Sequence, residues 1–424
     1  MSKALDIQNF GCRLNALDGD HIDRAARQAG LDNATVINSC AVTAEAVRQA
    51  RQAVRKAARD NPERPVFVTG CAAQTDAETF AAMPEVVQVL GNEEKLLAGS
   101  YHTDARPGEA KVDIRVGDIM QLEQAIPRNT MPPQNRARAF VQVQTGCDHR
   151  CTFCIIPFGR GNSRSTPVAE IIRDCRELVE QGHREIVLTG VDITSWGPDI
   201  GESGLDVLVR AILDGVPDLP RLRLSSVDAV ELEPGLLDVV VAEPRLMPHL
   251  HLSLQAGDDI ILKRMKRRHS RDEAIAFCEA MRRRRPDIVF GADIIAGFPT
   301  ETDEMFDNSL QLVEACQLVW LHVFPYSQRP GTPAERMPQV DGAVIKQRAA
   351  ALRAEGDRIR HNWLESRIGT VQNVLVEKAD RGRTGTFAQV ILPRPQKIGS
   401  LVDVRISGHD GRVLNGRMLN EEMV

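Results

Sequence analysis

The stretch Cys147-Asp148-His149-Arg150-Cys151-Thr152-Phe153-Cys154 places three thiols within eight residues, in the spacing Cys-x3-Cys-x2-Cys. Residues 139–144, just before it, alternate apolar and polar side chains as a half-buried strand does. The three cysteines, called here the loop cysteines, are therefore expected on a loop at a strand exit, where α/β enzymes carry their chemistry. Three thiolates from one loop can bind three irons of a [4Fe–4S] cluster and leave the fourth iron open. A structural zinc would need a fourth ligand nearby, and the next cysteine, Cys175, falls in a predicted helix.

Composition limits the class of protein. The chain has 424 residues, of which 42% are hydrophobic and 26% charged, with a net charge of −5. This length predicts two or three domains, and the charge means that any nucleic-acid surface must be local. No apolar run approaches membrane-spanning length, and the first residues lack the apolar region of a signal peptide. With nine cysteines, we therefore expect no membrane partner, a cytoplasmic protein and reduced thiols that hold metal clusters.

Residues 1–125 are predicted to form a first domain with a parallel sheet, because strand-like runs alternate with helical stretches. The carboxyl ends of parallel strands lie along one edge, so residues that follow the strands converge there. Three cysteines follow strands in this way and predict a second metal site; separate buried core cysteines are the plainer alternative. The strand-like runs are 4–10, 34–38, 65–69 and 85–90, and the three edge cysteines are Cys12, Cys40 and Cys71.

Residues 126–366 are predicted to form a central domain. A connection of weak periodicity precedes it and contains Pro107, Pro127, Pro132 and Pro133. Six strand-like runs with helical stretches between them favour an incomplete barrel of six βα units. These runs are 139–144, 185–189, 221–225, 249–254, 288–295 and 318–324.

Residues 367–424 follow a predicted long polar helix over about 341–366. Their alternating runs, separated by glycines, predict a small antiparallel β-barrel. This segment has nine Lys and Arg against six Asp and Glu, so it is basic although the whole chain is acidic. The four runs are 370–377, 385–392, 401–406 and 412–417.

The loop-cysteine stretch closely resembles the motif of the radical S-adenosylmethionine (SAM) enzymes. The resemblance implies that the loop cysteines are catalytic: their cluster binds SAM, and an electron from it cleaves SAM to a 5′-deoxyadenosyl radical. Thr145 departs from many relatives, which have an acidic residue there, and Ala256 stands where the family has serine. If the acidic residue positions substrate or SAM in relatives, another group must do so here. The strand exits resemble the family's SAM-binding segments, which implies contacts from Gly190, Asp192, Ser226, Gln255, Gly297 and Tyr326.

Within these enzymes the resemblance narrows to the methylthiotransferases. Segments 11–15, 38–46 and 69–74 are similar to the family's three auxiliary-cluster segments. This implies that Cys12, Cys40 and Cys71 hold a second [4Fe–4S] cluster whose open iron carries the sulfur to be transferred. The last segment resembles the TRAM domain, an RNA-binding barrel of tRNA-modifying enzymes. The resemblance spans nearly the whole chain.

The combined resemblance implies a tRNA methylthiotransferase that converts a C–H bond of a modified adenosine to C–SCH3. A base beside the anticodon lies in a single-stranded loop and can be splayed out into a buried site. Gly11-Cys12-Arg13-Leu14-Asn15 and Cys40-Ala41-Val42-Thr43 are most similar to the branch that acts on C2 of N6-threonylcarbamoyladenosine-37. The isopentenyladenosine branch tends to have Gly-Cys-Gln-Met-Asn, and the ribosomal-protein branch Gly-Cys-Pro-Lys-Asn.

Further partners follow from the same resemblance: the tRNA anticodon loop, an electron donor such as a flavodoxin or ferredoxin, and an iron–sulfur assembly system. Basic residues could bind tRNA phosphates, although most basic runs are solvated helix faces. Two alternatives to a tRNA enzyme stay open: a methylthiotransferase for a ribosomal-protein aspartate, and a non-catalytic RNA-binding protein whose six cysteines hold zinc. The candidate RNA contacts are Arg160, Arg164, Arg267 and Arg268, and the expected core cysteines are Cys175, Cys278 and Cys316.

Overall fold

A computed structural model describes residues 5–102, 112–125 and 137–419. The four prolines of the predicted connection, Pro107, Pro127, Pro132 and Pro133, lie outside these ranges. Within the described ranges, no helix is long and apolar enough to cross a membrane.

The chain folds into two compact units. All six cysteines assigned to clusters belong to the first unit, because the loop cysteines fold with the N-terminal residues. The predicted domain division at 125 and 366 stays a prediction. The first unit comprises residues 1–131, 144–166 and 327–335; the second comprises residues 132–143, 167–326 and 336–424.

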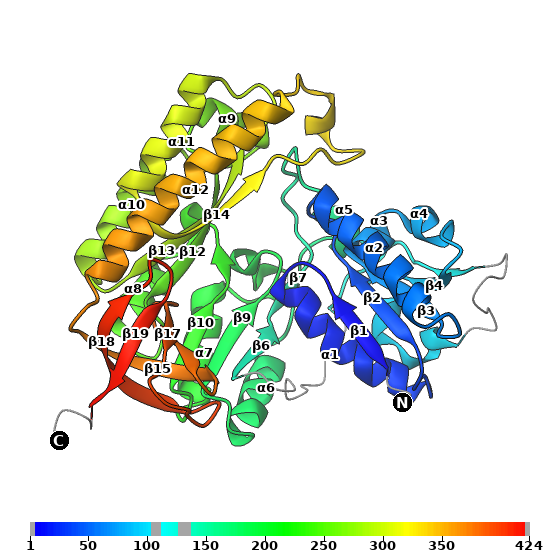
Figure 1. Cartoon of the computed structure of the whole chain (residues 1–424), viewed down its shortest axis with the longest axis horizontal. Coiled ribbons are helices and arrows are strands. Elements are labelled where there is room, and N and C mark those ends of the chain that lie inside the picture. Colours follow the sequence, from blue (N-terminus) through cyan, green and yellow to red (C-terminus); the bar gives the residue numbers. More distant parts are fainter. Residues whose placement is uncertain (1–4, 103–111, 126–136, 420–424) are drawn as a thin grey trace. The chain divides into compact units, whose positions relative to one another are not determined.

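The first unit contains a five-stranded parallel sheet in the order β1-β2-β3-β4-β5 (Figure 1). The four predicted strands are confirmed, and β5 is an addition whose three residues are too few to show a period. The strands are β1 (Asp6–Asn9), β2 (Thr35–Ser39), β3 (Val66–Gly70), β4 (Val86–Leu90) and β5 (Asp113–Arg115); the helices between and after them are α1 (Arg13–Gln28), α2 (Ala44–Asp60), α3 (Cys71–Thr75) and α4 (Ala77–Ala81).

Both faces of this sheet are covered by helices. Alternate strand residues point to opposite faces, so Phe67 packs in one core with Ile22 of α1, whereas Val68 packs in another core with Val54 of α2. A sheet that is buried on both faces leaves its strand ends as the place for polar chemistry. The loop-cysteine stretch adds three short elements to this unit: β7 (Gln144–Thr145), α5 (Ile156–Arg160) and β8 (Arg164–Ser165).

The second unit contains the six predicted strands of the incomplete barrel, which are confirmed. With the short β11 as a seventh strand they form two pieces, β10-β9-β6 and β11-β12-β13-β14. An isolated parallel bridge pairs Leu222 of the first piece with Leu246, which lies three residues before β12. The strands are β6 (Arg138–Gln142), β9 (Glu185–Thr189), β10 (Arg221–Leu224), β11 (Ser226–Val227), β12 (His249–Gln255), β13 (Val289–Ala296) and β14 (Leu318–Pro325).

Helices pack on the outer face of this sheet. Along β12, Leu250, Leu252 and Leu254 join the main core, so His249 and His251 face the other way. The long α12 lies beside α11 and β14 (Figure 1). Cys175, Cys278 and Cys316 are fully buried in this core, as expected. The helices are α6 (Val168–Glu180), α7 (Leu205–Gly215), α8 (Pro234–Ala242), α9 (Asp259–Met265), α10 (Arg271–Arg284), α11 (Asp303–Ala315) and α12 (Gly342–Glu365).

The C-terminal strands close into a barrel in the order β15-β16-β17-β19-β18. The barrel is confirmed, but its β17–β19 pair is parallel, so it is not wholly antiparallel. The single strand predicted over 385–392 is wrong, because the chain turns there: Phe387 has φ +74° and stacks its ring on His249, 5.2 Å between centroids. The strands are β15 (Val371–Lys378), β16 (Arg381–Thr384), β17 (Gln389–Ile391), β18 (Leu401–His409) and β19 (Leu414–Met418).

A buried carboxylate anchors the base of the incomplete barrel. Glu185 Oε1 accepts a hydrogen bond from Arg223 Nε at 2.8 Å, and Oε2 lies 3.4 Å from Arg221 Nη1. Arg221 also donates to the carbonyl of Asn373 in the C-terminal barrel at 2.6 Å. Burial would raise the pKa of Glu185, but the nearby guanidinium of Arg223 and its neighbours hold that pKa below the ordinary value of 4.5.

Glu185→Gln is expected to lower the free energy of unfolding of the second unit by about 3 kcal/mol, because buried arginines lose their carboxylate. A depressed folded-state pKa stabilises the fold above the unfolded pKa, and this stabilisation disappears as pH falls through the folded pKa. The difference between wild type and variant should therefore shrink below about pH 4.5, as measured by calorimetric unfolding.

Glu314→Gln is the matched control for that experiment. Glu314 also pairs with an arginine, Arg358, at 2.9 Å, but its side chain is 61% exposed. An exposed pair contributes at most about 1 kcal/mol. Equal effects of the two substitutions would contradict the structural role assigned to Glu185.

Candidate metal centres

The edge cysteines converge at the carboxyl ends of three neighbouring strands. Cys12 caps the start of α1 after β1, Cys40 follows β2, and Cys71 begins α3 directly after β3. Cys40 and Cys71 are each 4% exposed, whereas Cys12 is exposed. A Cβ added at Gly11 would lie 2.5 Å from Cys40 Sγ, so the backbone just before Cys12 closes onto Cys40. The structure thus brings together residues that lie 59 positions apart in the chain.

The neighbouring thiols also affect the pKa of Cys40. Burial, together with the neighbouring Cys71 and Cys12, raises the pKa of Cys40 to about 12, while Arg160 opposes this shift. Three neighbouring thiols suit a soft, thiolate-binding metal centre. Their donor chemistry therefore fits a cluster held by three cysteines.

The loop cysteines occupy a tight loop of the first unit, and all three are half-buried. The backbone N–H of Cys147 donates to the carbonyl of Gly161 at 3.0 Å, and the N–H of Ser163 donates to Asp148 Oδ1 at 2.9 Å. Ala334 donates to the carbonyl of Thr152 at 2.9 Å. These bonds fix the loop from both ends and from a distant segment. Three thiols presented by so constrained a loop also fit a three-cysteine cluster.

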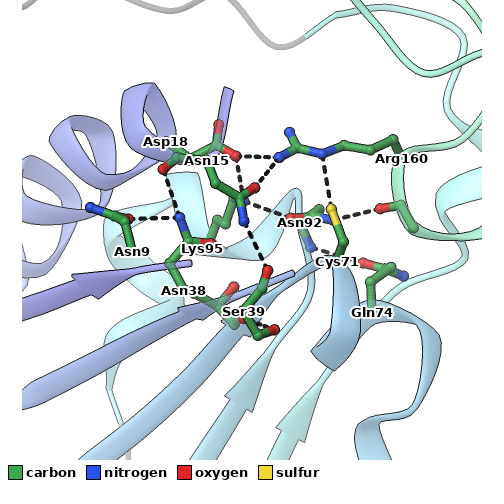
Figure 2. A network of polar contacts seen from close by, with 12 residues as sticks. Asn9, Asn15, Asp18, Asn38, Ser39, Cys71, Gln74, Asn92, Lys95 and Arg160 are labelled. Atoms are coloured by element: carbon green, nitrogen blue, oxygen red, sulfur yellow. Dashed lines mark hydrogen bonds and ion pairs between the residues drawn. The ribbon is translucent and has the colours of Figure 1, made fainter. Parts of the chain in front are cut away.

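A buried polar network surrounds Cys71 (Figure 2). Arg160 Nε donates to Cys71 Sγ at 3.2 Å, and its Nη2 lies 2.7 Å from Asp18 Oδ2. Lys95 Nζ lies 2.7 Å from the same carboxylate oxygen and donates to Asn92 Oδ1 at 2.6 Å. Asn92 Nδ2 in turn donates to Cys71 Sγ at 3.6 Å. Two N–H groups therefore point at one sulfur, as donors do around metal-bound thiolates.

The network around Cys71 carries an excess of positive charge. Arg160 and Lys95 contribute two buried positive charges, and Asp18 contributes one negative charge. Burial lowers the pKa of Lys95 to about 8, although Asp18 opposes that shift. Burial would likewise lower the pKa of Arg160, but Asp18 and Cys71 raise it above its usual value. One positive charge remains in excess, and a metal-bound thiolate at Cys71 would balance it.

The network joins the two cysteine sets within the first unit. Arg160 ends α5, which begins two residues after Cys154, and α5 packs on α3. A Cβ at Gly159 would lie 3.2 Å from Cys71 Cβ, so α5 presses directly against an edge cysteine. Sequence reasoning missed this arrangement, because Asp18 and Lys95 carry no motif. The one signal was Asn15 of the matched 11–15 segment, which accepts a hydrogen bond from Arg160 at 2.6 Å.

The six residues assigned to SAM lie in the second unit at the strand exits where they were predicted. Asp192 accepts a hydrogen bond from Ser195 Oγ at 2.6 Å, and Tyr326 N donates to the carbonyl of Ala296 at 2.9 Å. Their contact with SAM stays a prediction. Gly190 and Asp192 follow β9, Ser226 begins β11, Gln255 ends β12, Gly297 follows β13 and Tyr326 follows β14.

One of these six residues has a packing role. Gly297 has φ +74°, and a Cβ there would lie 2.5 Å from Ile345 Cγ1 of α12. Its N–H donates to Glu301 Oε2 at 2.9 Å. Glycine is thus required for close packing of α12, whether or not the residue also contacts SAM.

Three of the four predicted RNA contacts have buried side chains and make hydrogen bonds or ion pairs within the protein. Arg160 and Arg164 are 3% and 2% exposed, and Arg164 Nη2 donates to the carbonyl of Arg160 at 2.9 Å. The side chain of Arg267 is 8% exposed; it pairs with Asp228 and donates to a backbone carbonyl of β12. Only Arg268, with a 60% exposed side chain, lies at the surface, and Glu231 pairs with it at 2.6 Å. Contact of these four arginines with tRNA stays a prediction.

A second polar cluster was also missed. His251 Nε2 lies 2.8 Å and His322 Nδ1 lies 3.1 Å from Asp293 Oδ1, on three neighbouring strands. Burial would raise the pKa of Asp293, but hydrogen bonds from the two histidines hold it well below the ordinary value. Two imidazoles and a carboxylate could hold a divalent metal, and they also satisfy one another by hydrogen bonding. The alternation of side chains along these strands could have predicted that the three residues share one face of the sheet.

Comparison with known proteins places these sites in a family context. The Radical SAM superfamily model matches residues 141–313, and that of Uncharacterized protein family UPF0004 matches residues 4–91. Threonylcarbamoyladenosine tRNA methylthiotransferase MtaB of Rickettsia prowazekii is 45% identical over 405 residues, covering 95% of this chain and 94% of the relative. A tRNA-2-methylthio-N(6)-dimethylallyladenosine synthase of Paracoccus denitrificans is 33% identical over 429 residues, covering 96% and 94%.

Solved structures support the fold. The radical S-adenosylmethionine methyltransferase TsrM of Kitasatospora setae matches with a TM-score of 0.57 at 15% identity, over 79% of this chain and 75% of that chain. The relatives identify the family more narrowly than the solved structures do. Their alignments cover 95% and 94% of this chain and so include both the segment with the edge cysteines and the segment with the loop cysteines. The chain therefore belongs to the radical SAM methylthiotransferase family, in its MtaB-like branch.

Proposed function

We propose that this protein transfers a methylthio group to C2 of N6-threonylcarbamoyladenosine-37 of tRNA. The observation that carries the proposal is the placement of two three-cysteine sets in one unit, joined through Arg160 and Cys71. Such an enzyme needs one centre that activates a C–H bond and another that carries sulfur. The MtaB name of the relatives, and the Gly11–Asn15 segment, support threonylcarbamoyladenosine as the modified base.

In the proposed mechanism, separate groups of residues would hold the two clusters and SAM. The loop cysteines would hold one [4Fe–4S] cluster, and the edge cysteines another. When bound, these groups and SAM would supply the electron, the radical and the sulfur and methyl groups of the product. Arg160 and Asn92 would orient the sulfur of Cys71 and stabilise its negative charge. The proposed SAM contacts at the strand exits are Gly190, Asp192, Ser226, Gln255, Gly297 and Tyr326.

The proposal also includes the binding partners and the cellular compartment of the enzyme. The tRNA anticodon loop would deliver the base, since a single-stranded loop can present it for reaction. An electron donor of the flavodoxin or ferredoxin class would reduce the clusters, and an iron–sulfur assembly system would load them. Such an enzyme would work in the cytoplasm, with the C-terminal barrel acting as a TRAM-like RNA-binding domain.

Mass spectrometry of tRNA nucleosides from a deletion strain tests the substrate. Loss of the methylthio form of threonylcarbamoyladenosine is expected, and an undiminished amount would contradict the proposal. The Paracoccus relative supports a second candidate, the isopentenyladenosine-type base. Loss of that methylthio nucleoside instead would support it, and a change confined to a ribosomal protein would favour the aspartate-modifying alternative.

Complementation of the same strain with cysteine variants tests the division of work. Replacing Cys147, Cys151 and Cys154 with alanine should abolish SAM cleavage in vitro. Cys12→Ala should preserve SAM cleavage but stop methylthiolation, because only the sulfur-carrying centre loses a ligand. Iron and sulfide analysis after anaerobic reconstitution supplies the control: a protein with zinc but no iron would support the non-catalytic alternative.

A further inference from the structure

The first unit contains a cleft of about 720 Å³ beside α2, lined entirely by residues of that unit. Four arginines line this cleft, which is here called the arginine cleft. Asp76 is the one acidic side chain among its lining residues. The four are Arg48, Arg51 and Arg55 of α2 and Arg329 of the 327–335 segment.

The wall that carries Arg329 is fixed to α2. Ser327 Oγ accepts a hydrogen bond from the backbone N–H of Ala44 at 2.9 Å, at the first residue of the helix. Arg329 Nη2 donates to the same Ser327 Oγ at 3.0 Å, and Arg329 is 7% exposed. The cleft is therefore built from two segments held in place by hydrogen bonds, rather than from loosely hanging side chains.

Two of its arginines are available to a ligand. Arg51 Nε is buried and has no hydrogen-bond partner among the described residues. Within the same ranges, neither Arg51 nor Arg55 forms an ion pair. Arg48 pairs with Glu45 at 2.6 Å, but both side chains are more than half exposed, and such a pair is weak enough to exchange partners. The cleft thus differs from Arg160 and Arg267, whose charges are already used inside the protein.

The spacing of the charges fits an extended anion. Arg48, Arg51 and Arg55 are three and four residues apart, so they share one face of α2. At 1.5 Å per residue they extend over about 10 Å along the helix. Four arginines line the cleft against one aspartate, and although Glu45 offsets Arg48, an excess of positive charge remains in a chain whose net charge is −5. A row of cations of this length fits successive backbone phosphates better than a single carboxylate.

The cleft also borders both cysteine sets. Ala41 and Ala72 line it and directly follow Cys40 and Cys71, and Ile155 lines it and directly follows Cys154. A nucleic-acid strand held here would pass close to the residues that carry the clusters. A solvated helix face, the usual fate of basic runs, would neither enclose a cleft nor leave Arg51 Nε buried without a partner.

We infer that the arginine cleft binds anionic groups of the tRNA substrate, with backbone phosphates as their source. This inference rests on the proposed function, because it takes tRNA as the partner. It adds to that function an RNA-binding surface on the first unit, so that RNA binding is not assigned to the C-terminal barrel alone. The carboxylate of the threonylcarbamoyl group has the same chemistry and is the other possible source of the anion.

The test measures binding of full-length protein to tRNA over a series of salt concentrations. Two transcripts of one tRNA are compared, one unmodified and one carrying threonylcarbamoyladenosine-37. The double variant Arg51→Gln/Arg55→Gln is expected to bind both more weakly, and the slope of log K against log salt should fall by roughly 0.7 per arginine. Arg51→Lys/Arg55→Lys should restore most of that slope, since it preserves the charge.

Arg59→Gln is the matched control, because Arg59 is an exposed arginine of α2 that does not line the cleft. Equal weakening for both tRNAs supports phosphates as the ligand. Weakening confined to the modified tRNA supports an anion cleft that reads the carboxylate. Unchanged affinity and slope for both would overturn the inference, whereas a wild-type protein that binds neither tRNA would overturn the proposed function itself.

Discussion

Arg160→Met is expected to destabilise the first unit by about 3 kcal/mol and to alter the centre held by the edge cysteines. The substitution removes the guanidinium that pairs with Asp18 at 2.7 Å and donates to Cys71 Sγ at 3.2 Å (Figure 2). Asp18 would keep Lys95, so the carboxylate stays partly compensated. Breaking one partner out of a buried pair nevertheless costs several kcal/mol. Calorimetric unfolding of the protein without clusters measures this cost.

The same variant has a spectroscopic readout. A positive charge and an N–H donor at Cys71 Sγ stabilise the more negative, reduced form of a thiolate-bound cluster. With the loop cysteines replaced by alanine, only the centre of the edge cysteines remains to be titrated. Arg160→Met should then lower its reduction potential, and Arg160→Lys should lower it less, because lysine preserves the charge but not the fixed fork of donors.

Arg27→Met provides the control. Arg27 pairs with Asp23 at 2.9 Å on α1, the helix that also carries Asp18, but the Arg27 side chain is 50% exposed. An exposed pair of this kind contributes at most about 1 kcal/mol. If Arg160→Met changes neither stability nor potential more than Arg27→Met does, the network around Cys71 has no role beyond ordinary packing.

Much of the architecture could be predicted because its signals are local. The spacing of the loop cysteines and the alternation of strands with helices lie in short windows of sequence. The convergence of Cys12, Cys40 and Cys71 followed from one rule, that parallel strands share an edge for their carboxyl ends. The structure brings these three residues together as that rule requires.

The polar interior could not be predicted in this way. Asp18, Lys95 and Arg160 lie far apart in the chain and form one network only after folding. Arg160 illustrates the difficulty: a basic residue near the cysteine loop suggested RNA, yet it is buried and paired with Asp18 inside the first unit. The more accessible arginines of α2 were not among the candidate residues, because no motif marks them in the sequence. Phe387 shows a third limit, since tertiary stacking on His249 outweighs strand propensity.

The two cysteine sets share more than a unit of the fold. Because α5 packs on α3 and Arg160 reaches Cys71, any shift of the loop that carries Cys147, Cys151 and Cys154 would be transmitted to an edge cysteine. If each set holds a cluster, as proposed, this packing would keep the two centres in place, and a misplaced reacting group reduces the rate steeply. The structure therefore predicts that damage at the loop will reach both sites.

Gly146→Ala is expected to be such damage. Gly146 has φ +74°, and a Cβ there would lie 1.8 Å from the carbonyl oxygen of Asn162 and 2.8 Å from that of Gly161. Both neighbours are backbone atoms, which cannot rotate away. The Gly161 carbonyl also accepts the N–H of Cys147 at 3.0 Å, so relief of the clash must loosen the loop cysteines. We expect a loss of roughly 3 kcal/mol or more, from left-handed strain and overpacking together.

Gly331→Ala separates the two causes of that loss. Gly331 belongs to the same unit and has a similar φ of +82°, but a Cβ there would meet nothing within 4 Å. It should therefore show only the left-handed strain, about 1 to 2 kcal/mol. Calorimetric unfolding and the iron content after reconstitution compare the variants, and only Gly146→Ala should lose iron. Similar losses of stability in the two, with iron preserved in both, would show that residues 161–162 yield freely and that the loop is not held by this contact.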